Sequence, residues 1–327
     1  MIALAPIDNR IPKWDIDRLV LRLCPFCRTI NPSLLIRPDK LPVAFCNKCG
    51  CWYVDHLPPL ESIRAFYNGY YNTHRPSDLS GRQVSLMFRD AYDSSKTNQQ
   101  LQTLLKLHVG KDRMRILDVG CGLGKFLLEA RMAGADVVGC DISPEACEFA
   151  NNKLGIKVYK SELHSCASSI GSVDAVVMRD LIEHLIDPLM SIHSACSILN
   201  KGGLLLLLTP NGGEAGIDAE TGSNWVGFRV DLEHLQYLSP QTINWLSEEC
   251  GMRIEQLETK GFPFLKDVDR MSVRKSEIVT SIRENAKRIP GMRGIVRTLR
   301  MIKSELVGVQ NDPNLGFYHL CTVLRKI

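Results

Sequence analysis

The 327-residue sequence lacks any apolar segment long enough to cross a membrane, since its longest apolar run, Leu204–Leu208 with its flanks, has the length of a strand. The N-terminal Met1–Pro6 has no basic region followed by an apolar core, so no signal peptide is expected. Internal repeats and low-complexity tracts are also missing, and a net charge of +4 is too small to indicate nucleic-acid binding by itself. These absences favour a cytoplasmic globular protein.

Disulfides are not expected either, although the chain has 12 cysteines. Two C-x-x-C knuckles, Cys24-Pro-Phe-Cys27 and Cys46-Asn-Lys-Cys49, are separated by 18 residues. Four thiolates in this arrangement satisfy tetrahedral zinc and leave no open coordination position, so the spacing predicts a structural zinc site at Cys24, Cys27, Cys46 and Cys49. A redox dithiol and metal-free core cysteines are the alternatives, and Cys51 is left over.

A glycine turn carries the strongest functional signal, in the run Ile116-Leu-Asp-Val-Gly-Cys-Gly-Leu-Gly-Lys-Phe-Leu127. Glycines at 120, 122 and 124 allow close approach of a ligand, but Lys125 stands where the nicotinamide-binding fingerprint has its third glycine. Asp118 inside the motif would repel a pyrophosphate, whereas it suits the ammonium and sulfonium groups of S-adenosylmethionine. Asp141 follows about 20 residues later, where a carboxylate binds ribose hydroxyls.

Apolar and amphipathic segments alternate from Ile116 onward, which predicts an α/β fold with a Rossmann-like, seven-stranded, doubly wound sheet. We expect strands at 115–119, 136–141, 157–159, 175–178, 204–209, 253–260 and 318–325, and helices at 125–133, 144–154, 188–198 and 240–250. The last strand is expected to be antiparallel. The predicted domains are a zinc ribbon at 1–60, a helical linker or lid at 61–114, a cofactor-binding domain at 115–263 and 313–327, and a basic helical insertion at 264–312 before the last strand.

Two Glu-His pairs are candidates for acid–base chemistry. Glu183-His184 follows the fourth strand, and ligands bind at the carboxyl ends of strands in open α/β sheets. His234 follows Glu233 in the loop after the fifth strand. Histidine titrates near neutrality, so Glu183, His184 and His234 are the predicted catalytic residues. Either histidine could instead pack the scaffold, and the nearby Trp225, Phe228 and Tyr237 form either an acceptor wall or part of the core.

With these residues in place, the chain resembles class I S-adenosylmethionine-dependent methyltransferases over about Leu104–Phe262 and the C-terminal strand. The motifs that carry the resemblance are Leu117–Gly124, Asp141, Asp174 with Glu183–Leu185, and Lys201–Gly203 with Thr209–Asn211. The four-cysteine ribbon followed by Phe66-Tyr67 and Tyr70-Tyr71 is similar to a bacterial subgroup associated with sugar and polysaccharide biosynthesis.

The resemblance implies that Asp118, Gly120 and Gly122 surround the methionine moiety of the cofactor, that Asp141 binds its ribose and that Ile142 lies beside its adenine. Glu183 and His184 would lie at the acceptor. We add Cys121 and Arg179, which flank the same cleft, to the cofactor-binding set. Deoxysugar C-methyltransferases carry a further C-terminal domain without a counterpart here, which favours methylation of oxygen or nitrogen.

The expected reaction is therefore O-methylation of a sugar, nucleotide-linked or in a glycan, or of a similar small hydroxylated metabolite. The alternatives are an RNA or protein methyltransferase that holds a polymer with its ribbon and basic helices, and a cofactor-binding module without catalysis. Lys266–Lys303 holds 11 Lys and Arg residues against four acids. It reads as a solvated insertion, and contact with an anionic membrane surface or a lipid-linked glycan, or with a nucleotide diphosphate or RNA, stays open.

Overall fold

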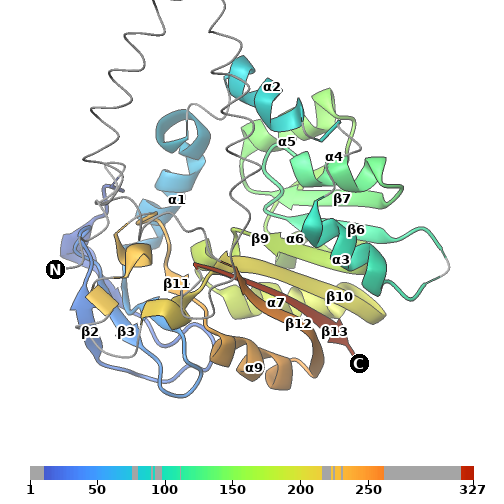
Figure 1. Ribbon diagram of the computed structural model, residues 1–327. Helices are drawn as coiled ribbons and strands as arrows, with labels where there is room; N and C mark the ends of the chain where they lie inside the picture. The colour runs from blue at the N-terminus through green and yellow to red at the C-terminus, as the bar shows by residue number, and fades with distance from the viewer. Residues whose placement is uncertain are drawn as a thin grey trace, which may run out of the picture.

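The computed structural model describes residues 11–75, 80–89, 91–92, 98–110, 112–215, 222–223, 225–229, 231–260 and 318–327 (Figure 1). The predicted basic insertion at 264–312 lies outside these residues. Among the helices that are described, none combines the length and the apolar character needed to cross a membrane.

A seven-stranded sheet in the order β12-β13-β10-β9-β6-β7-β8 forms the centre of the molecule. Its strands are β6 (Arg115–Val119), β7 (Asp136–Asp141), β8 (Val158–Lys160), β9 (Val173–Arg179), β10 (Leu199–Pro210), β12 (Met252–Lys260) and β13 (His319–Lys326). Adjacent strands from β8 to β10 are parallel, whereas β13 runs antiparallel to both β10 and β12. The predicted α/β fold with an antiparallel last strand is confirmed.

Helices cover both faces of this sheet (Figure 1). In β10, Leu204 and Leu206 pack in one core with α3 (Gln99–Leu107) and α4 (Lys125–Met132). Their neighbours Leu205 and Leu207 pack in another core with α6 (Leu163–Ile170), α7 (Pro188–Ile198) and α9 (Pro240–Glu249). Successive side chains of a strand point to opposite faces, so an all-leucine run is what a strand buried on both faces requires.

Three helices begin where the sequence predicts, because each has a capping side chain followed by proline. Ser143, Asp187 and Ser239 accept hydrogen bonds from the first turns of α5 (Pro144–Lys153), α7 and α9. Proline fits the first helical position, since the N–H that it lacks would have no partner within the helix. Helix α6 was not predicted, because its serine-rich sequence LHSCASSI has little helical preference.

The N-terminal region forms two small sheets. β1 (Val20–Leu21) pairs with β5 (His56–Leu57), and the other sheet has the order β11-β4-β3-β2. The latter contains β2 (Ser33–Ile36), β3 (Pro42–Phe45), β4 (Trp52–Val54) and β11 (Gln236–Tyr237). Strand β11 follows β10 in the chain, so the part of the sequence predicted to bind the cofactor supplies a strand to the ribbon sheet (Figure 1).

Aromatic side chains fill the space between the ribbon and the large sheet. Phe228 and Tyr237 lie with ring centroids 4.9 Å apart, and Phe228 lies 5.4 Å from Trp52 of the ribbon. Trp225 lies 5.0 Å from Tyr237. Trp225, Phe228 and Tyr237 are buried, so these aromatic residues form part of the scaffold.

The segment between the ribbon and the seven-stranded sheet is helical. The segment at 61–114, predicted as a helical linker or lid, contains most of α1 (Leu60–Asn68) and a π-helix, η2 (Tyr70–His74). It also contains α2 (Gly81–Arg89) and α3.

Candidate active site

The glycine turn between β6 and α4 has the backbone shape that the sequence predicts. Gly120, Gly122 and Gly124 have φ angles of 68°, 52° and 84°. Residues that carry a Cβ atom rarely adopt such positive values. The Gly120 N–H donates to the Cys140 carbonyl at 2.8 Å, and the Gly122 N–H donates to Asp141 Oδ2 at 2.8 Å. These two bonds fasten the turn to the carboxyl end of β7.

Two other segments approach this turn closely. A Cβ atom at Gly120 would lie 2.8 Å from Leu181 Cδ1, in the loop after β9. A Cβ atom at Gly122 would lie 2.8 Å from the hydroxyl oxygen of Tyr71, in η2. Because the chain order reverses between β6 and β9, this is the edge of an open α/β sheet where ligands bind.

Asp118 is a buried carboxylate at this edge, and only 4% of its surface is exposed. Among the described residues none donates a hydrogen bond to it. Burial raises the pKa of Asp118 to about 7, and the nearby Arg179 guanidinium opposes that rise. Arg179 lies 4.7 Å from the centroid of the Phe126 ring, and its buried Nε has no hydrogen-bond partner in the described part of the chain. Both charged groups have hydrogen-bonding capacity left for a ligand.

Asp141 ends β7, and each of its oxygens accepts a backbone hydrogen bond. Oδ2 takes the Gly122 N–H and Oδ1 takes the Ser143 N–H, both at 2.8 Å. Burial raises the pKa of Asp141, and these N–H groups oppose the shift. Each carboxylate oxygen has a second lone pair, so Asp141 can still accept from a ligand hydroxyl. The adjacent Ile142 is 50% exposed.

Cys121 and Arg179 differ in what they offer a ligand. The Cys121 side chain is buried in a core with Leu127 and Val158, so only its backbone can face the cleft. Arg179 is the last residue of β9 and presents its guanidinium beside Asp118.

The three predicted catalytic residues lie together. A carboxylate oxygen of Glu183 and one ring nitrogen each of His184 and His234 lie within 4.8 Å of one another. Glu183 and His184 belong to the 3-10 helix η4 (Ile182–His184) after β9, while His234 comes from the loop before β11. The two imidazole rings meet edge to face with their centroids 4.6 Å apart.

Glu183 is buried and held by hydrogen bonds. It is 1% exposed and accepts a hydrogen bond from Thr209 Oγ1 at 3.0 Å. Burial raises the pKa of Glu183 well above its usual value, and Asp180 raises it further. Its backbone carbonyl accepts the Leu235 N–H at 2.7 Å, which ties the loop after β9 to the loop that carries His234.

Both histidines are neutral near pH 7. Burial lowers the pKa of His184 to about 4, with Glu233 opposing the shift, and burial lowers the pKa of His234 well below its usual value. The Tyr67 hydroxyl lies 2.9 Å from His184 Nδ1. His234 Nδ1 is buried and has no hydrogen-bond partner among the described residues.

A family model described as a methyltransferase domain matches residues 90–257, just over half of the chain. The chain belongs to this methyltransferase family. The match includes the glycine turn, Asp141, Glu183, His184 and His234, and it excludes the cysteine ribbon.

Curated relatives of this methyltransferase match over part of their length. It is 39% identical over 103 residues to a ubiquinone biosynthesis O-methyltransferase of Xanthomonas axonopodis pv. citri, covering 30% of this chain and 43% of the relative. It is 28% identical over 161 residues to the protein of the same name from Dinoroseobacter shibae, covering 46% of this chain and 64% of the relative. The chain thus spans less than two thirds of these relatives.

Among solved structures, magnesium protoporphyrin IX methyltransferase from Synechocystis, with bound S-adenosylhomocysteine, aligns with a TM-score of 0.48 and 14% identity. The alignment covers 81% of this chain and all of that one.

The structure adds residues that the sequence analysis did not assign to the methyltransferase site. His74 Nε2 and Arg75 Nη2 lie 3.3 and 3.5 Å from Oε1 of Glu233, which is 1% exposed. Tyr67 contacts His184, as described above. The aromatic pairs at 66–67 and 70–71 were the available sequence signal, but a local pattern could not show that α1 and η2 reach over the site.

The four knuckle cysteines also lie together, with their sulfurs within 4.8 Å of one another. Cys24 and Cys49 sulfurs are 3.5 Å apart, and Cys27 and Cys46 sulfurs are 3.3 Å apart. Cys51 is buried outside this group, and its thiol donates to the Trp52 carbonyl at 3.2 Å.

The low pKa of His184 gives a direct test by NMR titration of the 15N-histidine-labelled protein. Burial disfavours the charged ring, so the His184 signal should stay at its neutral position from pH 8 to pH 5.5 and move only as the pH approaches about 4. The His184→Gln variant identifies the signal. A transition centred between pH 6 and 7, as in an unfolded chain, would contradict the burial.

Proposed function

We propose that this protein is an S-adenosylmethionine-dependent methyltransferase that methylates a hydroxyl group of a small molecule, and that the acceptor is a sugar, free, nucleotide-linked or in a glycan. The observation that carries the proposal is the pairing of two features at one sheet edge. A glycine turn with a buried carboxylate, Asp118, that accepts no hydrogen bond from the described residues lies at the same edge as a cluster of two neutral histidines, His184 and His234.

The cofactor side of the site fits S-adenosylmethionine. Its ammonium and sulfonium groups would compensate the buried charge of Asp118, and its carboxylate would accept a hydrogen bond from Arg179 Nε, which has no partner among the described residues. Asp141 would accept from the ribose, with Ile142 beside the adenine. When bound, S-adenosylmethionine supplies an electrophilic methyl group, and loss of that group leaves a neutral thioether.

The acceptor side supplies a place for the proton that a methylated hydroxyl loses. Burial lowers the pKa of His234 and so keeps its ring neutral, and Nδ1 has no hydrogen-bond partner among the described residues. We assign the ring proton to Nε2, which leaves Nδ1 to take the proton of the acceptor. Tyr67 keeps its proton, since burial raises its pKa well above the usual value, and donates it to His184 Nδ1. His184 then carries its own proton on Nε2 and can donate a hydrogen bond to the acceptor.

The methylated atom and the class of acceptor are proposed on different grounds. Oxygen methylation is in line with the curated relatives, which are O-methyltransferases by name. The sugar rests on the similarity of the ribbon and the aromatic pairs to the bacterial subgroup. A polymer acceptor has less support, because ribbon arginines are engaged internally: Arg28 pairs with Asp187 at 2.8 Å, and Arg37 pairs with Asp39 in the buried interior.

We also propose that the four knuckle cysteines hold one structural zinc ion. Sulfurs about 2.3 Å from a central zinc ion lie about 3.8 Å from one another, close to the separations of 3.3 and 3.5 Å. Two turns shape the knuckles: the Arg28 N–H donates to the Cys24 carbonyl, and the Gly50 N–H donates to the Cys46 carbonyl. All four ligand positions would be filled by protein, so this zinc would have a structural role.

Cofactor binding should depend on pH through Asp118. Above its pKa of about 7 the carboxylate attracts the cationic cofactor, and below it protonation removes the attraction. Calorimetry should show S-adenosylmethionine binding about eightfold more weakly at pH 6.0 than at pH 7.5. Asp118→Asn should bind weakly at both pH values. Asp136→Asn, at the exposed start of β7, should behave like the unmodified protein. Equal wild-type affinity at both pH values would refute the role of Asp118.

Methyl transfer itself is tested with methyl-labelled S-adenosylmethionine and two acceptor pools, nucleotide sugars and catechols. Label should enter the nucleotide sugars, and His234→Gln should reduce transfer by about 10²–10⁴-fold with unchanged cofactor affinity, because it removes the proton acceptor. His193→Gln, on the exposed face of α7, is the control. Label in catechols alone would redirect the substrate class, and transfer to neither pool would count against the activity.

The zinc proposal predicts one zinc ion per chain by elemental analysis of protein purified without chelators. Cys46→Ser should lose the metal and the ordered ribbon, because a ribbon of this size has too little apolar core to fold without it. Cys51→Ser should keep the metal, since Cys51 lies outside the group of four. Metal-free wild-type protein with an intact ribbon would exclude the site.

A further inference from the structure

A buried ion pair in the ribbon extends to the loop that carries the acceptor-side residues. Arg37 and Asp39 lie in the connection between β2 and β3, where side chains are ordinarily solvated, yet both side chains are 0% exposed. The connection is a tight turn, with the Lys40 N–H donating to the Arg37 carbonyl and the Arg37 N–H donating to the Leu41 carbonyl.

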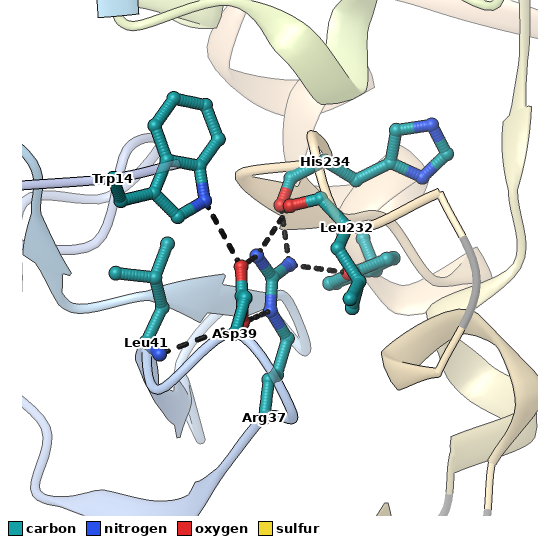
Figure 2. A network of polar contacts seen from close by, with 7 residues as sticks. Trp14, Arg37, Asp39, Leu41, Leu232 and His234 are labelled. Atoms are coloured by element: carbon teal, nitrogen blue, oxygen red, sulfur yellow. Dashed lines mark hydrogen bonds and ion pairs between the residues drawn. The ribbon is translucent and has the colours of Figure 1, made fainter. Parts of the chain in front are cut away.

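The Arg37 guanidinium makes five hydrogen bonds, as many as it has N–H groups (Figure 2). Two go to Asp39, from Nε to Oδ1 at 3.1 Å and from Nη2 to Oδ2 at 2.5 Å. The other three leave the ribbon hairpin: Nη2 to the Leu232 carbonyl at 2.7 Å, Nη1 to the His234 carbonyl at 2.5 Å and Nη1 to the Tyr237 hydroxyl at 2.7 Å.

Asp39 is itself held in place. Its Oδ2 accepts from Trp14 Nε1 at 3.1 Å and its Oδ1 accepts from the Leu41 N–H at 3.4 Å (Figure 2). A planar guanidinium with every donor used has one orientation, so the two carbonyls that it binds are fixed relative to the ribbon.

Fixing these carbonyls also determines where the side chains between them point. The Leu232 and His234 carbonyls face the guanidinium, whereas the His234 imidazole points away from it (Figure 2). Glu233, between the two carbonyls, reaches His74 and Arg75 instead. Asp231, just before them, has a positive φ of 49°, a conformation that local sequence alone does not favour.

We propose that Arg37, oriented by Asp39, is a positioning residue through which the ribbon sets the orientation of Glu233 and His234 and so forms part of the acceptor site. The inference rests on the proposed function only for calling this the acceptor side. The ribbon then acts on the site through the loop at 231–235 of the same chain, whose carbonyls Arg37 binds.

The test uses the full-length, metal-loaded protein and two variants. Arg37→Lys keeps a charge beside Asp39 but has three N–H donors in place of five and no planar fork, so it cannot make all five hydrogen bonds. It therefore separates the need for an ion pair from the need for the guanidinium. The double variant Arg37→Met with Asp39→Leu removes both charges together and avoids leaving one of them buried alone. Arg18→Lys is the control, because Arg18 forms exposed ion pairs with Asp15 and Glu61 in the same N-terminal region.

Four readouts that need no acceptor are measured: amide hydrogen exchange, the His234 ring signal in 15N-histidine NMR, assigned with His234→Gln, the zinc content and the affinity for S-adenosylmethionine. In both Arg37 variants we expect exchange at 231–238 to rise at least tenfold and the His234 signal to shift. Exchange at 115–141, zinc content and cofactor affinity should stay within twofold. Arg18→Lys should change none of these.

The proposal is overturned if Arg37→Lys leaves loop exchange and the His234 signal unchanged. It is equally overturned if exchange rises throughout the chain with loss of zinc and cofactor binding, since Arg37 would then stabilise the fold as a whole. Neither result bears on methyl transfer, so failure here is distinguishable from failure of the proposed activity.

Discussion

A short backbone pairing between β11 and β4 joins the methyltransferase domain to the ribbon. In β11, Gln236 and Tyr237 pair with Tyr53 and Trp52 of β4, so a loop of the methyltransferase domain completes the ribbon sheet. The pairing continues into the site, because the Val54 N–H donates to the Leu235 carbonyl, next to His234. A ribbon too small to build its own core shares an aromatic core with its neighbour, and the backbone pairing between them ends next to His234.

Burial of charge is the second constraint on the site. Asp118, Asp141, Glu183 and Glu233 are all largely buried, and burial raises the pKa of the first three. An uncompensated carboxylate in such surroundings is costly, so these groups persist where something offsets the charge. Backbone N–H groups do so for Asp141, and the Arg75 guanidinium, 3.5 Å away, does so for Glu233. Asp118 has only Arg179 nearby, which makes it the carboxylate best suited to a cationic ligand.

Local chemistry explains what the sequence could and could not predict. The glycine turn, the capped helices and the all-leucine strand were predictable because each follows from a short run of residues. The ribbon cysteines were predictable as a group because their spacing is typical of one kind of site. The Arg37 network was not, since it joins residues about 200 positions apart, and hairpin charges normally face solvent. Tyr67, His74 and Arg75 were missed as site residues for the same reason, because their partners come from distant segments.

The low pKa values of the two histidines are compatible with a role in methyl transfer. A base with a pKa near neutrality is best when proton removal limits the rate, but alignment supplies much of the acceleration in a displacement at a methyl group. As the acceptor oxygen forms its bond to carbon it becomes positively charged, and its proton becomes acidic enough for a weak base to remove. Burial keeps the His234 ring neutral across the physiological pH range, and the hydrogen bond from Arg37 to the His234 carbonyl holds the backbone that carries the ring. In the proposed reaction, this fixed geometry offsets the low basicity of the ring.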